Sequence, residues 1–534
     1  MQSPIPLKTT QATLDTLDTI MARTIDAARD RPIDDQQVVV SRIADLATRL
    51  RAARDLLEYA AEAGSAFEEK AGIFAAAAAQ QIVEMVRVHG PEHGIEDVNW
   101  IGPELESFAR EGLAEARLRA LGRQVAERRG RNDCPLDEIH ELTRDAVREF
   151  AEAEIAPHAE RIHRTDALVP ESFIEKMAEL GYFGLSIPER FGGSEMGNLA
   201  MVVTTEELSR VSLAAAGSLI TRPEILSKAL LAGGTEEQQR RWLPPIARGE
   251  LMVGISVTEP DVGSDVASVK CRAQPAELEG VTGYRITGPK AWCTFAGRAD
   301  VLAVLCRTDP DPSLGARGLS LFIVPKPRSD GHEFEVRQPG GGMLSGKADA
   351  TPGYRGMHSF TLSFEDYFVP ADHLVGQERG LGKGFYLQMG GFAAGRLQTG
   401  GRACGVAQAA LEKTAEYVVD RLQFGRPVSE FQLTQHKLGW MDVQIAAARA
   451  ITYAAARAMD EDERAAAPYA AQCKLLACDV AVEVTQVGQL LHGGWGYAEE
   501  YPISRYVIDA QVLPIFEGVK PILQLKVVGR SLLA

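Results

Sequence analysis

The chain has 534 residues, and its 57 Lys and Arg against 73 Asp and Glu give a formal net charge of −16. This length is sufficient for roughly three or four domains of ~100–200 residues each. The acidic balance argues against a protein that binds nucleic acid or an anionic membrane, because both partners require clustered Lys and Arg. Local basic sites for a small anionic ligand remain compatible with this charge.

Seven cysteines are scattered along the chain, with no CxxC pair and no histidine at metal-ligand spacing: Cys134, Cys271, Cys293, Cys306, Cys404, Cys473 and Cys478. This pattern favours reduced thiols over disulfides or a zinc site, as in a cytoplasmic protein. The first residues lack a basic segment followed by an apolar run, so no signal peptide is expected. No uninterrupted apolar stretch approaches the ~20 residues that span a bilayer. We therefore expect a cytoplasmic location.

Residues 1–135 are expected to form an N-terminal helical extension. From residue 10 onward, Leu, Ile and Val recur at three- and four-residue spacing among Ala, Glu and Arg, which predicts amphipathic helices. Breaks near Pro32, Gly64 and the 89–94 loop predict about four of them. A polar linker at 128–135 predicts the first domain boundary. The apolar faces favour packing against another surface over a separate partner-binding module.

The remaining chain changes its periodicity twice. Residues 136–250 continue the helical pattern. Residues 251–375 contain short β-branched or aromatic segments separated by Gly, Pro and Asp, which predicts a small β-domain. Its expected strands are 253–257, 284–286, 301–306, 319–324, 333–336 and 358–364. Residues 376–534 return to long helices, expected at 385–419, 432–458 and 465–491. This order predicts an α+β protein, mostly α, with two helical layers enclosing a β-barrel-like module rather than a βαβ repeat.

Two segments of the predicted β-domain have the composition of a ligand site. The loop from Thr258 to Ser264 is rich in small residues and hydroxyls, so its backbone N–H groups can approach a ligand closely. Trp292 and Thr294 lie two apart in a predicted strand and would face the same side. A lone Trp in a β-domain is usually a core residue, but an aromatic plane beside a hydroxyl is a more specific pattern.

Near the C-terminus, Glu517 follows Pro514 and precedes Gly518 at the expected start of a last helix. A tight turn there would project the carboxylate into a cleft. The simpler alternative is a glutamate in a first helical turn, which the helix dipole favours. The stretch alone leaves both interpretations open.

Four segments occur together in an order and spacing that resemble the acyl-CoA dehydrogenase family: residues 255–265, 288–294, 421–425 and 516–518. The resemblance covers residues 136–534. It implies a helical N-domain, a central β-barrel-like domain and a C-terminal four-helix domain. It also implies FAD as cofactor, an acyl-CoA substrate and an electron-transfer flavoprotein as electron acceptor.

The same resemblance assigns roles to residues of the β-domain. Thr258 and Ser264 are expected to contact FAD or the thioester. Trp292 is expected against the isoalloxazine ring, with the Thr294 hydroxyl at the flavin N5 edge.

In the C-terminal domain, the resemblance implies that Arg421 and Phe424 reach the FAD of a neighbouring subunit, Arg421 as the cation for its pyrophosphate. The backbone of Gly493 and Gly494 is expected near that same pyrophosphate. A cofactor shared in this way implies a homotetramer or homodimer.

Glu517 matches the family's catalytic base, which removes the α-proton of the thioester while the β-hydride passes to flavin N5. Burial against Ile515 and Phe516 is expected to raise its basicity. Some members carry the base immediately before an arginine on an earlier helix. Here that place is Gly395, before Arg396, so Glu517 is the candidate of the two, and Arg396 is expected beside the substrate.

Several positions depart from the family pattern. Val519 stands where Thr is common, and two glutamines of relatives are replaced near Pro521 and at Leu490, so those FAD contacts must be lost or made differently. The Gly-rich segment 340–346 has no role that the resemblance explains.

The extension and the segments 217–226 and 518–523 resemble those of family members whose short acyl group ends in a free carboxylate. Thr221 and Arg222 then fall at the base of the acyl pocket, and Arg222 is the candidate partner of that carboxylate. The alternative for Arg222 is a surface ion pair on a helix. Other functions left open are a dehydrogenase or oxidase for another short branched or dicarboxylic acyl-CoA. A DNA-binding, non-catalytic relative is a remote alternative that the acidic composition does not favour.

Overall fold

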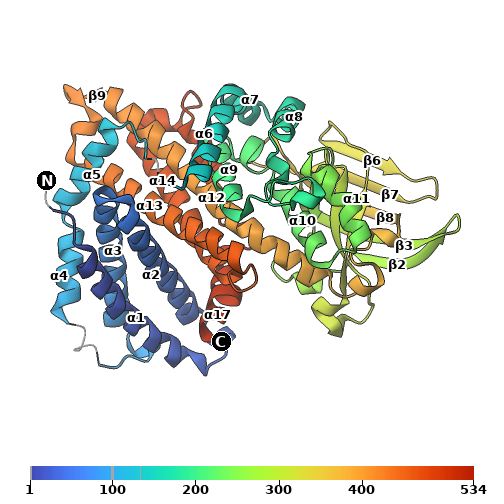
Figure 1. Ribbon diagram of the computed structural model, residues 1–534, viewed down its shortest axis with the longest axis horizontal. Coiled ribbons are helices and arrows are strands. Elements are labelled where there is room, and N and C mark those ends of the chain that lie inside the picture. Colours follow the sequence, from blue (N-terminus) through green and yellow to red (C-terminus); the bar gives the residue numbers. More distant parts are fainter. Residues whose placement is uncertain (1–2, 98–101, 133) are drawn as a thin grey trace. The chain divides into compact units, whose positions relative to one another are not determined.

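The computed structural model describes residues 3–97, 102–132 and 134–534 (Figure 1). Residue 133 of the predicted linker lies outside this set. The chain divides into two compact units. Unit 1 comprises Met1–Ala146 and Thr399–Ala534, and unit 2 comprises Val147–Gln398. The extension therefore shares a unit with the C-terminal helices, while the four-domain division expected from the sequence stays a prediction.

The predicted extension, residues 1–135, contains five α-helices in the described residues, one more than expected. They are α1 (Leu7–Arg29), α2 (Gln37–Ala63), α3 (Ser65–His89), α4 (Pro103–Gly112) and α5 (Glu115–Glu127). The predicted breaks near Pro32, Gly64 and 89–94 are present. The extra break follows Gly112, a residue common at helix ends, which the sequence analysis did not use.

The C-terminal region contains six α-helices in the described residues, of which the three longest lie close to their predicted ranges. The six are α12 (Gly384–Asp420), α13 (Gln432–Glu461), α14 (Ala467–His492), α15 (Ile503–Ala510), α16 (Lys520–Ile522) and α17 (Arg530–Leu533). The boundary between the units falls within α12, after Gln398, and within α6 (Glu138–Phe150), after Ala146.

The extension packs tightly on α13 inside unit 1. Gly122 of α5 and Gly439 of α13 allow the two backbones to touch, because a Cβ on either glycine would overlap a backbone oxygen of the other helix. Lys70 of α3 and Asp442 of α13 form a buried ion pair of 3.0 Å, with side chains 1% and 0% exposed. Although α3 is apolar enough to span a membrane, 72% of its most apolar window is buried. The helix therefore behaves as a core helix of this unit.

The helices within unit 2 precede its sheet. They are α7 (Ala156–Thr165), α8 (Glu171–Glu179), α9 (Gly197–Val211), α10 (Thr221–Gly233) and α11 (Glu236–Ala247). A capping box between Thr235 and Gln238 sets the start of α11.

The sheet of unit 2 has eight strands in the order β1-β4-β2-β3-β8-β7-β6, with β5 paired to β4. They are β1 (Val253–Ser256), β2 (Arg272–Leu278), β3 (Val281–Thr294), β4 (Val301–Arg307), β5 (Leu319–Pro325), β6 (Glu333–Arg337), β7 (Met343–Ala348) and β8 (Ser359–Pro370). The sequence analysis missed β2 and β7. The Gly-rich segment 340–346 supplies the turn between β6 and β7 and the start of β7.

One hydrophobic core joins the helices of unit 2 to the sheet. It contains Phe183 and Ile220 from the helical part and Phe295, Phe322 and Phe360 from the β part, each at most 1–2% exposed. Figure 1 shows α10 and α11 lying beside the strands. This core gives the loops at the strand ends a rigid base.

Candidate functional site

A buried ion pair holds the Thr258–Ser264 loop against β3 in unit 2. The Glu259 carboxylate accepts hydrogen bonds from the backbone N–H groups of Lys270 and Cys271, the latter at 2.7 Å. Lys290 Nζ lies 3.1 Å from Glu259 Oε1 and donates to the Val257 carbonyl at 2.9 Å. The Ala291 N–H donates to the Thr258 carbonyl at 2.8 Å. The loop is thereby fixed to the strand that carries Trp292.

Trp292 and Thr294 stand at the end of β3, where Trp292 lies within an irregularity in the pairing and Thr294 follows it. A β-bulge between Lys290 and Cys293 interrupts the two-residue alternation on which the shared-face prediction depends. Trp292 has φ +58° and is 60% exposed, whereas Thr294 is 7% exposed. Thr294 Oγ1 lies 3.1 Å from Ser359 Oγ. An exposed indole on left-handed backbone is costly, and such strain concentrates at ligand sites.

The two other predicted residues of this loop differ in exposure. Thr258 is half-buried and Ser264 is exposed. Their proposed contacts with FAD or the thioester stay predictions.

In unit 1, a pocket of about 650 Å³ lies at the C-terminal end of α14. Arg421, Gly493 and Gly494 contribute to its lining, together with Tyr417 and Trp495. Gly493 has φ +61°, and a Cβ on either glycine would meet nothing within 4 Å. A guanidinium beside open glycine backbone suits a phosphate group. This chemistry fits the pyrophosphate role expected for these residues.

Phe424 lies in the turn between the short strands β9 (Leu422–Gln423) and β10 (Arg426–Pro427). Its side chain is 93% exposed and its φ is +53°. Such exposure of a large apolar side chain fits the predicted contact of Phe424 with the FAD of a neighbouring subunit.

Glu517 lies in the turn between α15 and α16, with φ +56° and a side chain only 6% exposed. Arg402 Nη2 donates to both carboxylate oxygens, at 3.0 and 2.9 Å, and Thr399 Oγ1 donates to Oε2. The Arg402 side chain is 0% exposed, and its guanidinium lies 4.9 Å from the centre of the Phe516 ring. A carboxylate on strained backbone is thus held in place by a buried cation.

This surrounding differs from the apolar one expected for Glu517. Ile515 is 59% exposed and does not bury the carboxylate. The direct partners are a cation and a hydroxyl, and a neighbouring guanidinium stabilises an ionised carboxylate. Thr399 and Arg402 were missed from the sequence. Their three-residue spacing on one helix is a weak signal that only the position of Glu517 makes meaningful.

Arg222 lies in the first turn of α10 in unit 2, where it is 6% exposed. Its Nη1 is buried without a hydrogen-bond partner, and within the described residues it forms no ion pair. The alternative of a surface ion pair is therefore wrong. The neighbouring Thr221 is 0% exposed, and its Oγ1 also has no partner.

Further buried polar groups lie on the part of α12 that belongs to unit 2. Gln388 and Gln398 are each 1% exposed, and neither their amide nitrogens nor their oxygens have a partner in the described residues. This part of α12 packs on α10, since a Cβ on Gly391 would lie 2.7 Å from the Ile225 carbonyl oxygen. Arg396, on the same helix, is half-buried. Unsatisfied buried polar groups require a ligand or water to complete them.

Three family models match the chain. The N-terminal, middle and C-terminal domains of acyl-CoA dehydrogenase match residues 137–250, 254–367 and 382–533, respectively. The chain therefore belongs to the acyl-CoA dehydrogenase family, as the sequence resemblance indicated. It is an oxidoreductase whose cofactor is FAD, and the residues described above fit that cofactor.

Individual relatives agree with this assignment. The chain is 41% identical to (2S)-methylsuccinyl-CoA dehydrogenase from Cereibacter sphaeroides over 421 residues, 79% of this chain and 74% of the relative. Butyryl-CoA dehydrogenase from Megasphaera elsdenii is 30% identical with a TM-score of 0.68, covering 76% of this chain and 100% of that one. A chain in a solved structure of the electron transferring flavoprotein of Acidaminococcus fermentans is 31% identical with a TM-score of 0.67, covering 75% and 99%.

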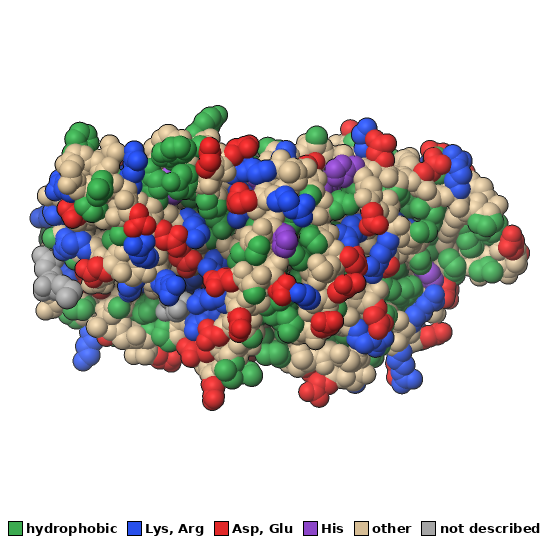
Figure 2. Space-filling model, turned by 90° about the horizontal axis from the view of Figure 1, so that it is seen from above, with side chains coloured by type: hydrophobic (Ala, Val, Ile, Leu, Met, Phe, Trp, Pro, Cys, Tyr) green, Lys and Arg blue, Asp and Glu red, His purple; other side chains and the backbone are tan. Residues whose placement is uncertain are grey.

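The distribution of charged side chains on the surface is relevant to the remote alternative of a DNA-binding relative. On the face drawn in Figure 2, acidic and basic side chains are intermixed, without a large region of one sign. A phosphate-binding surface would require clustered cations.

Proposed function

We propose that this protein dehydrogenates a short-chain acyl-CoA that ends in a carboxylate, and that its substrate is (2S)-methylsuccinyl-CoA, oxidised to mesaconyl-CoA in the ethylmalonyl-CoA pathway. The observation that carries the proposal is the buried guanidinium of Arg222, whose Nη1 has no partner. A buried cation without an anion costs several kcal/mol. A substrate carboxylate would remove that cost and form a charge-assisted pair. The methylsuccinyl-CoA dehydrogenase relative supports the same substrate.

Glu517 supplies the base in this mechanism. Its carboxylate takes the α-proton of the thioester, a very weak acid, while the double bond forms between the α- and β-carbons. FAD, when bound, accepts the hydride from the β-carbon. Arg402 and Thr399 orient the carboxylate before the substrate arrives. Proton transfer then requires a carboxylate oxygen to turn from Arg402 towards the α-carbon.

The test is a comparison of kcat/KM for methylsuccinyl-, glutaryl-, isovaleryl- and butyryl-CoA with one electron acceptor. We expect methylsuccinyl-CoA to exceed butyryl-CoA by about 10²-fold, as a charged partner in a buried pocket discriminates strongly against neutral acyl groups. Equal values for the two would contradict the substrate proposal while leaving the dehydrogenase chemistry in place. A preference for glutaryl-CoA would keep the dicarboxylic class and change the substrate.

An electron-transfer flavoprotein is the proposed acceptor, and the relative in the Acidaminococcus structure supports it. The competing function is an acyl-CoA oxidase, which would reoxidise with oxygen. Stopped-flow reoxidation of the reduced enzyme separates the two. We expect fast reoxidation by the flavoprotein and slow reoxidation by oxygen, with no stoichiometric hydrogen peroxide.

We also propose a cytoplasmic homo-oligomer, either a dimer or a tetramer. Large apolar side chains of unit 1 are exposed on and beside the pocket: Leu422, Phe424, Leu490, Trp495 and Tyr497 are 45–93% exposed. Apolar groups of this size gather at subunit contacts. Light scattering of the FAD-loaded protein should give a mass of two or four chains, and a monomer would contradict the proposal. Cell fractionation tests the location.

A further inference from the structure

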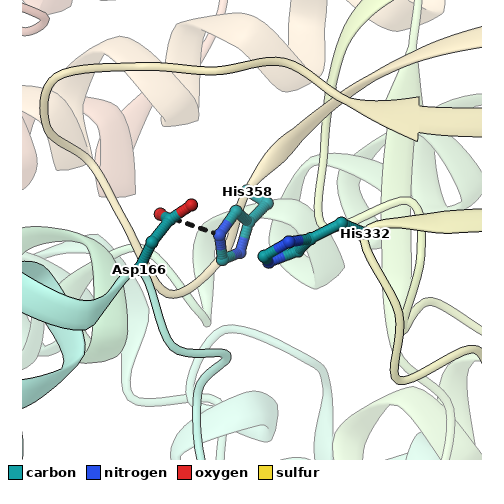
Figure 3. Close-up of side chains that lie close together, drawn as sticks. All are labelled: Asp166, His332 and His358. Carbon is teal, nitrogen blue, oxygen red and sulfur yellow. Dashed lines mark hydrogen bonds and ion pairs between the residues drawn. The ribbon is translucent and has the colours of Figure 1, made fainter.

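Asp166, His332 and His358 come together in unit 2, and none of the three has a role in the proposed dehydrogenase chemistry. Asp166 ends α7, His332 lies between β5 and β6, and His358 directly precedes β8. Their ligand atoms all lie within 4.8 Å of one another. Figure 3 shows Asp166 and His332 approaching the His358 ring from two sides. Two imidazoles and a carboxylate are ligands that zinc and similar divalent metals prefer.

The second observation concerns the two hydrogen-bond neighbours of the His358 ring. Its Nε2 lies 3.1 Å from Asp166 Oδ1, and its Nδ1 lies 3.3 Å from the Gly356 carbonyl oxygen. Both neighbours are acceptors, whereas a neutral imidazole carries only one N–H. The ring is buried, with only 4% of its surface exposed. In a neutral ring, one of the two nitrogen–oxygen contacts therefore has no hydrogen atom between its atoms, and a metal ion can take that place.

The geometry suits a metal ion in that place. With Nδ1–H donating to Gly356, the lone pair of Nε2 is available, which is the usual orientation of a metal-binding histidine. The 3.1 Å between Nε2 and Asp166 Oδ1 is close to the ~3.3 Å that separates two ligands of tetrahedral zinc at 2.0–2.1 Å bond lengths. His332 is exposed, so its ring can turn to complete the set.

Arg355 is a competing cation, since its Nε lies 3.4 Å from Asp166 Oδ1. It does not depend on Asp166, because it also donates to the carbonyls of Thr351 at 3.2 Å and His163 at 2.9 Å. Arg355 can therefore keep its backbone partners when the carboxylate turns to a metal.

We propose that Asp166, His332 and His358 form a binding site for a zinc-class divalent metal ion. The ion would link the end of α7 to the start of β8. The start of β8 is also where the Phe295 N–H donates to the His358 carbonyl at 2.8 Å and where Ser359 contacts Thr294. A bound metal would thus stiffen the backbone beside the predicted flavin-edge hydroxyl.

The test is calorimetric titration of the tag-free, FAD-loaded protein with Zn²⁺ alone, alongside thermal unfolding with and without Zn²⁺. We expect one Zn²⁺ per chain and a raised Tm, with Mg²⁺ giving neither. His332→Ala should weaken zinc binding at least about 100-fold, since loss of a ligand exceeds the 10–100-fold cost of losing an outer-shell contact. His332 is exposed, so this variant is expected to fold.

Asp166→Asn, which keeps the shape of the side chain, should weaken binding to a similar degree. His158→Ala, which removes an exposed histidine of α7, is the matched control and should bind zinc as the parent does. Equal zinc binding by the parent and His332→Ala, or equal binding of Mg²⁺, would overturn the proposal. So would a Tm that zinc leaves unchanged.

Discussion

Arg402 and Arg222 are both buried arginines on helices, but they differ in their partners. Arg402 is 0% exposed and bonded to both oxygens of Glu517. Arg222 is 6% exposed, and its Nη1 has no partner. A buried cation with an internal carboxylate positions that carboxylate, whereas a buried cation without one is poised for an anion from outside. Arg402 therefore positions the Glu517 carboxylate, whereas Arg222 is proposed to select the substrate.

The largest expected effect is on kcat and follows from changing Glu517, the carboxylate that Arg402 holds. Glu517→Gln keeps the shape of the side chain and one acceptor oxygen for Arg402 but removes the base. We expect kcat to fall by about 10²–10⁴-fold, the usual contribution of a general base, with FAD absorbance retained. Glu500→Gln, at an exposed position, is the control. A kcat within tenfold of the parent would show that another group removes the proton.

The next effect tests the unpaired arginine. Arg222→Met preserves much of the side-chain volume and removes the charge, so kcat/KM for methylsuccinyl-CoA should fall by about 10²-fold. The value for butyryl-CoA should stay the same or rise. Arg379→Met, at an exposed position of the same unit, should change neither. A parallel loss for both substrates would assign Arg222 to the structure of the pocket rather than to its specificity.

The two arginines are also expected to differ in their contributions to the free energy of unfolding. Arg402→Met leaves the Glu517 carboxylate buried without its cation and should lower the free energy of unfolding by about 3 kcal/mol. Arg222→Met removes a cation that has no internal anion, so it should not lower it. Denaturant unfolding of the substrate-free proteins measures both. The double variant Arg402→Met with Glu517→Gln should recover part of the loss, and additive effects would argue against direct coupling.

Lys326 is a third buried cation, and its hydrogen bonds go to backbone carbonyls. Its Nζ donates to Gly297, Ala299 and Pro327, and burial lowers its pKa to about 8 from an ordinary 10.5. Between pH 8 and 10.5, Lys326 is therefore mostly neutral in the folded chain and still protonated in the unfolded chain. Its contribution to the free energy of unfolding rises with pH across that range, by at most about 3 kcal/mol. Unfolding of the parent and Lys326→Met over this range measures the difference. A difference that is independent of pH would contradict the lowered pKa.

Local patterns in the sequence predicted much of the fold. The long helices α12, α13 and α14 and six of the eight strands follow from periodicity and turn residues. Strand β2 was missed because its burial alternates weakly, with Pro275 inside it. Strand β7 was missed because the glycines at 340–342 and Gly346 obscure a strand pattern, although Gly346 lies inside the strand.

The site was less accessible to sequence reasoning. Trp292, Thr294 and Glu517 stand out through motifs, but their partners depend on contacts between distant segments. Arg402 meets Glu517 across 115 residues, and Lys290 meets Glu259 across 31. The pattern of charges alone does not reveal which buried arginine has a carboxylate and which has none.

The measurement that tests the account most directly is anaerobic titration of the FAD-loaded protein with methylsuccinyl-CoA, followed at the flavin absorbance band. We predict rapid bleaching by methylsuccinyl-CoA, much slower bleaching by butyryl-CoA, and loss of this preference in Arg222→Met. Rapid bleaching by butyryl-CoA with none by methylsuccinyl-CoA, or an undiminished preference in the variant, would contradict the role of the buried, unpaired arginine.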